Sequence, residues 1–249
     1  MDICTTATVR PEILDRTLRS FYHNLFSGTP CRLVLNIDPI GDTSAHTTEE
    51  VIEVGHKYFD NILVNCPEKP CFPYALKWTW EQAQGKFFFN LEDDWELLAP
   101  MSLEDMVKAM NLDRNLASLR FPKGGATEIY CTQSRSPKEP KYKYNGLYYE
   151  CPPDRRDKEG YFGSPSLIRT SWAKRLTKTI DNSRSPEKQL RALKKAGDKR
   201  VSNWKYGVWS RPGINRLIVD IGTSWRRSRR IRKNSYTNFT EWSSDEGRD

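Results

Sequence analysis

Four short runs of apolar residues recur through the first half of the chain, and each predicts a β-strand. They are Ile3–Val9, Arg32–Ile37, Ile62–Val64 and Phe87–Leu91. The segments between the runs predict helices. The first begins at Pro11, where proline suits a first helical turn and apolar residues follow at helical spacing as far as Leu25. Further helices are expected to begin at Thr47 and at Pro73.

The order of these elements predicts the fold class. Strands that alternate with helices form a mainly parallel sheet joined by right-handed crossovers, so we expect a single α/β domain whose helices flank the sheet. The second half of the chain is less regular. Its expected elements are the strands Ala117–Phe121 and Leu217–Val219, a helix Trp172–Lys178 capped by Ser171 and a helix Pro186–Lys195. Residues 131–160 are expected to form a long loop or a small hairpin at Tyr142–Tyr149.

The most informative segment is residues 87–98, in which an apolar strand delivers Glu92, Asp93 and Asp94 into one short turn before Trp95. Adjacent carboxylates repel one another and are costly to hold near a low-dielectric core, so we expect a positive charge among them. A divalent metal ion is the simplest candidate. A solvated acidic turn that caps the next helix is the alternative.

These acids lie at the carboxyl end of a predicted central strand, which is where open α/β sheets bind ligands. Mg²⁺ and Mn²⁺ are usually held by one or two carboxylates together with substrate phosphates, so a phosphorylated ligand is implied. Neither a Gly-x-Gly-x-x-Gly motif nor a Walker loop follows the first strand. Metal together with Arg and Lys is therefore expected to bind the phosphates, which suits a nucleoside diphosphate.

Composition adds limits to this picture. The 249 residues carry 40 Lys and Arg against 32 Asp and Glu, a formal net charge of +8. No stretch approaches the roughly 18 apolar residues of a membrane span, and the N-terminus lacks the features of a signal peptide, so a cytoplasmic location is expected. The six cysteines form no CxxC pair and the three histidines all precede residue 57, a pattern that does not favour a zinc site.

Three segments together resemble the nucleotide-sugar-dependent glycosyltransferases of GT-A fold. These are the opening TTATVRPEILDRTLRSF, the Asp of NIDP after the second strand, and LEDDW, which is similar to the family's DXD metal motif. The resemblance implies a GT-A-like (Rossmann-like) domain that uses a nucleoside diphosphate sugar as donor and Mn²⁺ or Mg²⁺ as cofactor. A UDP sugar is the first candidate for the donor. It covers residues 1–125 well and implies that they form the nucleotide-sugar half, while residues 126–249 form the acceptor half.

The resemblance also implies donor-binding roles along the rim of the sheet. Thr5, Thr6 and Arg10 would line the nucleotide site, and Asp38 would accept a hydrogen bond from uracil or ribose. Two ordinary alternatives stay open at this point. Arg10 would be a surface charge at a helix start, and Asp38 would be a turn former before Pro39.

Within the DXD-like motif, the closing acid is the usual metal ligand. Asp94 would therefore bind the metal directly, while Glu92 and Asp93 would contact ribose, sugar or metal-bound water. Many relatives supply a histidine as a further ligand, but this chain has no His past residue 56. Asp220, which follows the strand Leu217–Val219, is expected to replace it, and otherwise the metal lacks that ligand.

An inverting transfer needs a carboxylate that takes the proton of the acceptor hydroxyl. In similar enzymes this base lies at the start of a helix, beyond a strand that faces the acceptor. Residues 161–168 resemble that strand, and Glu187, which follows Pro186, fits the position of the base, with Asp181 as its substitute. The alternative for Glu187 is that the helix dipole alone favours Glu in a first helical turn.

A basic cluster at residues 226–233 would clamp the diphosphate, hold an anionic acceptor or rest on an acidic membrane surface. The acceptor itself stays open between a lipid, a polysaccharide and a protein. Three competing functions remain: a nucleotide-sugar-binding protein without turnover, a metal-dependent nuclease or phosphatase, and a nucleic-acid-binding protein. No nucleic acid is expected as a partner, because acidic residues fill the rim where a phosphate backbone would lie.

Overall fold

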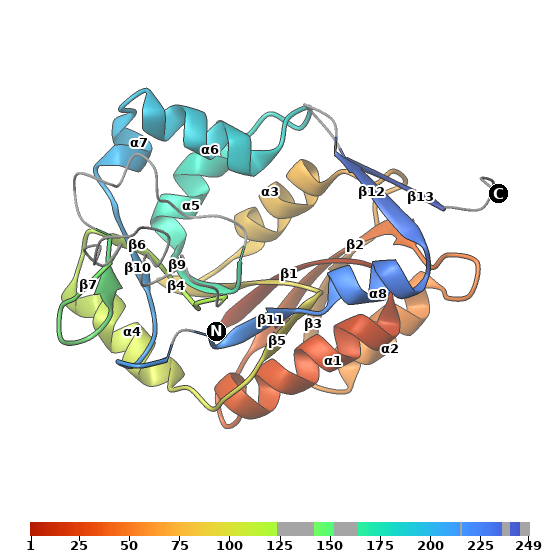
Figure 1. Cartoon of the computed structure of the whole chain (residues 1–249), viewed down its shortest axis with the longest axis horizontal. Coiled ribbons are helices and arrows are strands. Elements are labelled where there is room, and N and C mark those ends of the chain that lie inside the picture. Colours follow the sequence, from red (N-terminus) through yellow and green to blue (C-terminus); the bar gives the residue numbers. More distant parts are fainter. Residues whose placement is uncertain (124–141, 152–163, 215, 236–239, 245–249) are drawn as a thin grey trace, which may run out of the picture.

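A mixed sheet of nine strands forms the centre of the structure (Figure 1). The computed structural model describes residues 1–123, 142–151, 164–214, 216–235 and 240–244. The strands follow the order β3-β2-β1-β4-β9-β6-β10-β8-β7. Their bounds are β1 Asp2–Val9, β2 Arg32–Gly41, β3 Asn61–Asn65, β4 Phe87–Glu92, β6 Leu116–Arg120, β7 Lys143–Tyr144, β8 Tyr149–Glu150, β9 Ser166–Arg169 and β10 Lys205–Val208.

The parallel half of this sheet contains the four strands that the first half of the sequence predicts. β1 pairs in parallel with β2 and with β4, and β2 pairs in parallel with β3. β1 and β4 are buried almost throughout, as strands covered on both faces are. Beyond β4 the sheet is mixed, because β9 runs antiparallel to both of its neighbours. The expected single α/β domain with a large central sheet is confirmed.

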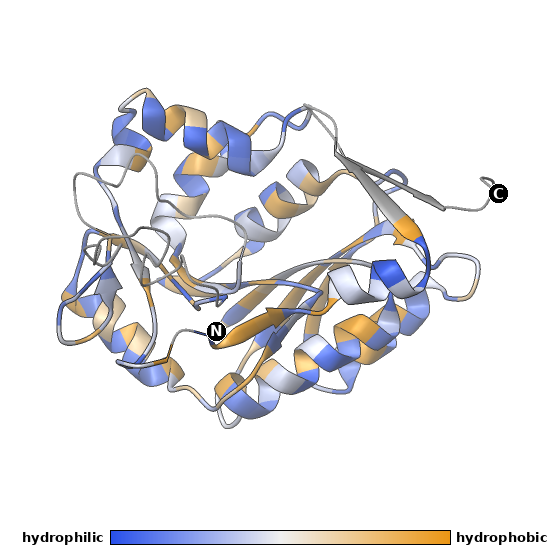
Figure 2. Ribbon diagram, in the orientation of Figure 1, coloured by the Kyte–Doolittle hydropathy of each residue, from blue (hydrophilic) through white to orange (hydrophobic). Residues whose placement is uncertain are grey.

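Helices cover both faces of the sheet. Leu14, Leu18 and Met106 pack on one face, whereas Trp80 and Trp172 pack on the other. Figure 2 shows that apolar residues gather in the central strands. The helices are α1 Pro11–Phe21, η1 Tyr22–Phe26, α2 Thr48–His56, α3 Phe72–Gln82, α4 Leu103–Leu112, α5 Thr170–Thr177, α6 Pro186–Lys195, α7 Lys199–Ser202 and α8 Gly222–Ser228.

Two local predictions are wrong. β2 continues to Gly41, where the sequence suggests a turn from Asp38 onward. It continues because β1 and β2 keep pairing past Asp38, through a register shift after which Val9 pairs with Gly41. α5 begins at Thr170 and has no side-chain cap, so Ser171 lies inside the helix instead of capping it. The first predicted helix, which extends to Leu25, is α1 followed by the π-helix η1, while the strand β5 (Trp95–Leu97) and the helix α4 have no counterpart among the predicted elements.

Two further strand pairs lie outside the main sheet. β5 pairs with β11 (Ile218–Asp220), and β12 (Ile231–Ser235) pairs with β13 (Thr240–Ser244). The pairing of β5 with β11 brings the C-terminal part of the chain beside the segment that follows β4. As a result, α8, which follows β11 directly, lies next to the end of β4 and close to α1 (Figure 1).

The predicted loop over residues 131–160 falls only partly on described residues. The hairpin expected at Tyr142–Tyr149 is confirmed as β7 and β8, while residues 131–141 and 152–160 lie outside the described residues. Of the predicted strand at residues 161–168, residues 161–163 lie outside them too, and Ser166–Ile168 belongs to β9. In the part of the chain that is described, no helix is both long enough and apolar enough to cross a membrane.

Candidate active site

The carboxyl ends of β1, β2 and β4 meet at one edge of the sheet. Thr6 of β1 pairs with Glu92 of β4, and Asp38 of β2 lies farther along the same edge, paired with β1. Since β4 ends at Glu92, Asp93 and Asp94 form the turn just beyond it. We call Glu92, Asp93 and Asp94 the acid turn. The fold therefore gathers the residues of the predicted donor site at this edge.

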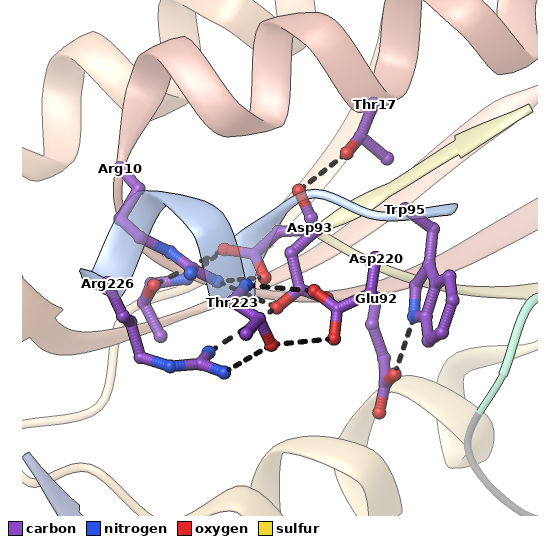
Figure 3. A network of polar contacts seen from close by, with 10 residues as sticks. Arg10, Thr17, Glu92, Asp93, Trp95, Asp220, Thr223 and Arg226 are labelled. Carbon is purple, nitrogen blue, oxygen red and sulfur yellow. Dashed lines mark hydrogen bonds and ion pairs between the residues drawn. The ribbon is translucent and has the colours of Figure 1, made fainter. Parts of the chain in front are cut away.

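Asp93 is buried, with only 4% of the residue exposed, and several donors of the protein surround it. One carboxylate oxygen accepts hydrogen bonds from the backbone N–H and the hydroxyl of Thr8 at 3.0 and 3.3 Å, and the other accepts one from Arg10 at 2.6 Å. The carbonyl of Asp93 accepts a hydrogen bond from the hydroxyl of Thr17 at 2.6 Å (Figure 3). Asp93 therefore holds the turn in place, and its contact with a donor stays a prediction.

Arg10 is the buried cation that the acid turn requires. Its side chain is 2% exposed and lies 2.6 Å from the carboxylate of Asp93 and 3.5 Å from that of Asp94. The guanidinium carbon also lies 5.2 Å from the ring centre of Trp225. Burial favours a lower pKa, but the charges of Asp93 and Asp94 outweigh it and raise the pKa of Arg10, so the guanidinium stays charged. Such a buried side chain excludes the surface-charge alternative.

Asp94 is held less tightly than Asp93. Its Oδ2 lies 3.5 Å from Nη2 of Arg10 and 3.9 Å from Nη1 of Arg226, which is too long for strong hydrogen bonds. Burial and then the charge of Asp93 raise the pKa of Asp94, although Arg10 acts in the opposite direction. An additional cation would therefore stabilise the ionised form of Asp94.

Glu92 is the last residue of β4, and it is the one member of the acid turn that belongs to the sheet. Its Oε2 accepts a hydrogen bond from the indole N–H of Trp95 at 2.9 Å, and the ammonium of Lys123 lies 4.5 Å from the centre of that ring. Burial, followed by the charge of Asp94, raises the pKa of Glu92. Glu92 and Asp94 therefore oppose each other's ionisation, and a bound cation would relieve this repulsion.

Asp220 reaches the site from β11, where it pairs with Trp95 of β5. Its carboxylate accepts hydrogen bonds from the backbone N–H and the hydroxyl of Thr223, both at 2.9 Å (Figure 3). The charge of Asp220 contributes to the raised pKa of Asp94, so the two carboxylates lie within electrostatic range. The side chain of Asp220 is exposed, and its role as a metal ligand stays a prediction.

Asp38 lies within β2, which excludes the turn-former alternative, and it is 5% exposed. Its carboxylate accepts hydrogen bonds from the side-chain amide of Asn36 at 3.0 Å and from the backbone N–H of Cys71 at 3.1 Å. Asn36 accepts a hydrogen bond from Asn65 at 2.6 Å. Burial raises the pKa of Asp38 to about 6. The carboxylate is thus fixed in orientation at the edge of the sheet.

Thr5 and Thr6 lie on opposite faces of β1, because side chains alternate along a strand. Thr5 is fully buried, pairs with Leu35 and Leu91, and its hydroxyl has no hydrogen-bond partner within the described residues. Thr6 is 9% exposed and lies on the same face as Glu92. Of the two, Thr6 is the better placed for a ligand, and a donor contact of either residue stays a prediction.

The two candidate bases lie in a different part of the chain from the acid turn. Glu187 is exposed in the first turn of α6, and Asp181 is exposed in the preceding loop. Asp181 accepts hydrogen bonds from the backbone N–H and the hydroxyl of Ser183, and these bonds lower its pKa. Among the described residues, neither carboxylate forms a hydrogen bond or ion pair with the acid turn. Their catalytic role stays a prediction.

α8 contributes two residues, Gly222 and Trp225, to which the sequence analysis assigns no role. A Cβ on Gly222 would lie 2.2 Å from Oδ2 of Asp94, so a glycine is what allows α8 to approach the acid turn. Trp225 packs on Arg10 and donates a hydrogen bond from its indole N–H to Glu12 at 2.7 Å. The segment IGTSW after an apolar strand is the only local signal for these contacts.

The donor set fits a divalent metal that a further ligand completes. Carboxylate oxygens from the acid turn and Asp220 are the hard ligands that Mg²⁺ and Mn²⁺ prefer. Within the described residues, no group of three His, Cys, Asp or Glu side chains is placed to hold a metal ion by itself. These ions commonly take one or two protein carboxylates and complete their shell with phosphate and water. Asp94 with a diphosphate matches that pattern.

Comparison with known proteins gives matches in structure. No family model and no curated protein matches the chain. S. aureus TarS matches with 16% identity and a TM-score of 0.55, over 84% of this chain and 35% of that one. S. aureus TarS 1–349 in complex with UDP-GlcNAc matches with 16% identity and a TM-score of 0.52, over 86% and 60%. The mannosyltransferase PcManGT from Pyrobaculum calidifontis, in complex with GDP-Man and Mn²⁺, matches with 12% identity and a TM-score of 0.54, over 90% and 59%.

These matches concern the fold. The chain spans 35% of the TarS chain and less than two thirds of the other two. At such low identities the likeness shows that the architecture is shared with proteins that bind nucleotide sugars, one of them a mannosyltransferase. The fold expected from the sequence is thereby confirmed.

Proposed function

We propose that the chain is a metal-dependent glycosyltransferase that takes its sugar from a nucleoside diphosphate sugar. UDP is the proposed nucleotide, and inversion is the proposed stereochemical course. The first half, residues 1–125, would bind the donor, and residues 126–249 would bind the acceptor. A narrower proposal is that the chain is related to one particular protein, majastridin, which its sequence resembles. The structures described above do not include that protein.

One observation carries the proposal. Asp38 and Asp94, together with Arg10, lie at the carboxyl edge of a sheet whose architecture is shared with proteins in complex with UDP-GlcNAc and GDP-Man. Ligands of open α/β sheets bind at that edge. Paired carboxylates next to buried arginine supply what a sugar nucleotide requires, because a carboxylate can orient base or ribose and cations can neutralise the diphosphate.

The residues would divide the work as follows. Thr6 and Asp38 would orient the nucleoside, and Thr5, the neighbour of Thr6 in β1, would line the same site. Asp94 would hold the metal, with Asp220 as the further ligand. Arg10 and Asp93 would fix Asp94 in position, and Glu92 would contact ribose or sugar.

The positive charge of the metal would stabilise the leaving diphosphate. The chain's own contribution is to position Asp94 just beyond β4, where a bound cation would favour its ionised form. Arg10 lies 3.5 Å from that carboxylate, and the buried pair of Arg10 with Asp93 holds Arg10 in place. Glu187, or Asp181 in its place, would take the proton of the acceptor hydroxyl.

A nucleotide-sugar-binding protein without turnover is the second candidate. It would use the same donor site at the acid turn without Glu187 or Asp181 acting as a base. The two candidates differ in one observable. A transferase releases UDP when donor and acceptor are both present, whereas a binding protein retains the intact sugar nucleotide.

Other expectations from the sequence become narrower proposals. The acceptor would be a lipid, a polysaccharide or a protein. Peripheral contact with an acidic membrane through residues 226–233 would rest on Arg227 and Arg230, which are exposed, because Arg226 and Arg229 contact acidic residues. A cytoplasmic location is part of the same proposal.

The experiment is calorimetric titration of UDP into the protein with Mn²⁺ and again with EDTA. We expect binding that depends on the metal and is lost in Asp94→Ala. Asp60→Ala is the matched control, because Asp60 is exposed beside the amino end of β3, at the opposite edge of the sheet. Absence of binding to UDP and to other nucleoside diphosphates would contradict the proposal. Metal-dependent hydrolysis of a phosphodiester would instead support the nuclease alternative.

A further inference from the structure

Three exposed apolar side chains gather at one end of the molecule. Leu112 ends α4 and is 65% exposed, while Tyr144 and Leu147 belong to the β7–β8 hairpin and are 45% and 42% exposed. Figure 1 shows this hairpin beside the last turn of α4, on the left, far from α8. Among the described residues, only Phe72 and Leu98 expose a large apolar side chain elsewhere. We call Leu112, Tyr144 and Leu147 the apolar patch.

The two parts of the apolar patch are joined by polar contacts. The hydroxyl of Tyr148 in the hairpin donates a hydrogen bond at 2.9 Å to the carboxylate of Asp113, which directly follows Leu112. The ammonium of Lys205 in β10 lies 3.0 Å from the same carboxylate and 3.3 Å from that of Glu150 in β8. These contacts connect the end of α4, the hairpin and β10. The apolar patch is therefore carried by elements that are fixed to one another.

Cationic side chains lie around the apolar patch. Lys108 precedes Leu112 by one turn on the same side of α4, and Arg114 follows Leu112 by two residues. Lys143 lies in β7, and all three cations are exposed. Within the part of the chain that the structure describes, no carboxylate forms an ion pair with them, whereas the carboxylates that hold the hairpin are paired with Lys205. This end of the molecule therefore combines uncompensated positive charge with exposed apolar side chains.

A membrane that contains anionic lipids is complementary to both properties. Tyr and Leu side chains can enter the headgroup region of a bilayer, where the hydroxyl of Tyr stays near water. Lys and Arg side chains close to an anionic surface are attracted to the lipid phosphates. A nucleic acid would engage the cations but would leave Leu112 and Leu147 without an apolar partner. The combination therefore favours a lipid surface.

We propose that the apolar patch and the three cations beside it form a docking site for an anionic membrane. The apolar side chains enter the headgroup region, and the cations contact lipid phosphates. The hairpin lies at the opposite end of the sheet from β3 and within residues 126–249, the proposed acceptor half. Docking at this end would bring a lipid acceptor to that half and leave the donor half open to water. The choice of a lipid acceptor rests on the proposed function, whereas the docking does not.

Removing either component of the docking site should weaken binding to vesicles. A cation close to an anionic surface contributes about fivefold to the affinity, so Arg114→Gln/Lys143→Gln should bind about 25-fold more weakly. Leu112→Ser/Leu147→Ser should bind about tenfold more weakly, because less apolar surface leaves water on docking. Tyr144 is kept in this variant, since its ring centre lies 5.1 Å from that of Tyr149 within the hairpin.

The test is cosedimentation of the full chain with vesicles of phosphatidylcholine alone and with vesicles of equal parts phosphatidylcholine and phosphatidylglycerol. We expect binding to the anionic vesicles that weakens as salt is added. Phe72→Ser/Leu98→Ser is the matched control for the apolar variant, because both residues are exposed and lie outside the apolar patch. Arg227→Gln/Arg230→Gln removes the same charge as the cationic variant from another exposed segment. Both controls should bind like the wild type, and urea unfolding checks that every variant folds.

Several outcomes would overturn the docking site. These are no preference of the wild type for anionic vesicles, unchanged binding by either test variant, or a loss that occurs in Arg227→Gln/Arg230→Gln and not in Arg114→Gln/Lys143→Gln. Sedimentation velocity adds a further check. A wild-type dimer that Leu112→Ser/Leu147→Ser converts to a monomer would assign the apolar patch to a second copy of the chain, and the membrane would be excluded as its partner.

Titration of UDP with Mn²⁺ separates this inference from the proposed function. Vesicle binding by a wild type that binds no UDP would leave the docking site standing while the proposed function fails. UDP binding without vesicle binding would overturn the docking site and leave the proposed function standing. The test variants should bind UDP like the wild type, because their substitutions lie outside the acid turn.

Discussion

Neighbouring acids in the acid turn have different surroundings and therefore different tasks. Asp93 is surrounded by donors from β1 and α1, and its carboxylate is paired with the buried guanidinium of Arg10. Asp94, the next residue, has only long contacts with cations. Two adjacent Asp residues in a sequence do not reveal which carboxylate is bound by other residues of the protein and which is available to a ligand.

The same substitution should cost much more stability at Asp93 than at Asp94. Asp93→Asn removes the carboxylate nearest to the buried guanidinium of Arg10, at 2.6 Å, so we expect the free energy of unfolding to fall by about 3–5 kcal/mol. Asp94→Asn removes a carboxylate whose ionisation burial disfavours, so the change in stability should stay within about 1 kcal/mol. Urea denaturation measures both. Equal losses of stability would show that Asp94 is as deeply engaged as Asp93 and would contradict the division of tasks.

At the scale of elements, apolar runs and helix starts were sufficient to predict much of the first half. β1, β4 and α1 agree with the sequence because each buries a continuous apolar run or stripe. α2 begins at a capping box, in which Thr47 and Glu50 each bond the other's backbone. β5 escaped prediction because its three residues pair only with β11, which lies far along the chain. A strand of that length carries no periodicity.

The approach of α8 to the acid turn depends on one glycine. A Cβ on Gly222 would lie 2.2 Å from Oδ2 and 2.7 Å from Cβ of Asp94, so either α8 or Asp94 must move in Gly222→Ala. We expect a loss of about 1–3 kcal/mol in the free energy of unfolding, together with weaker metal-dependent binding of UDP. Thermal or urea unfolding and calorimetry measure the two effects.

Ser224→Ala provides the control for that substitution, because Ser224 is exposed two residues along the same helix. It should change neither quantity by much, since alanine favours a helix and no contact is lost at an exposed position. Wild-type stability and UDP binding in Gly222→Ala would mean that α8 does not rest on Asp94 in solution. The site would then be built by the first half of the chain alone.

For the molecule as a whole, the edge of the sheet was predictable from the order of the elements, whereas Asp220 was expected at the site only through the resemblance. Parallel strands end at the same edge, so Asp38 and the acid turn had to meet there once the strands were known. No comparable rule leads from the sequence to α8, whose place depends on the pairing of β5 with β11. The same limit applies to Glu187 and Asp181, since a position in a first helical turn or a loop does not fix the distance to the site.

The gathering of acids at one edge also affects the stability of the whole protein. Burial raises the pKa of Asp38 to about 6, and it raises the pKa values of Glu92 and Asp94 as well. An unfolded Asp has its ordinary pKa of about 4. Between these values the folded protein keeps a proton that the unfolded chain has released. Stability contributed in this way is present at low pH and is lost as the pH rises through the folded pKa.

Asp38 isolates this effect, because it lies outside the acid turn. The free energy of unfolding of the wild type should fall relative to that of Asp38→Asn by up to about 3 kcal/mol as the pH rises from about 4 to about 6.5, since each pKa unit corresponds to about 1.4 kcal/mol. The amide of the variant meets two donors, from Asn36 and from Cys71, and this adds a loss of stability that is independent of pH. The slope against pH, and not the offset, is therefore the quantity to compare. Urea unfolding of both proteins across this range measures it, and parallel curves would contradict a raised pKa of Asp38.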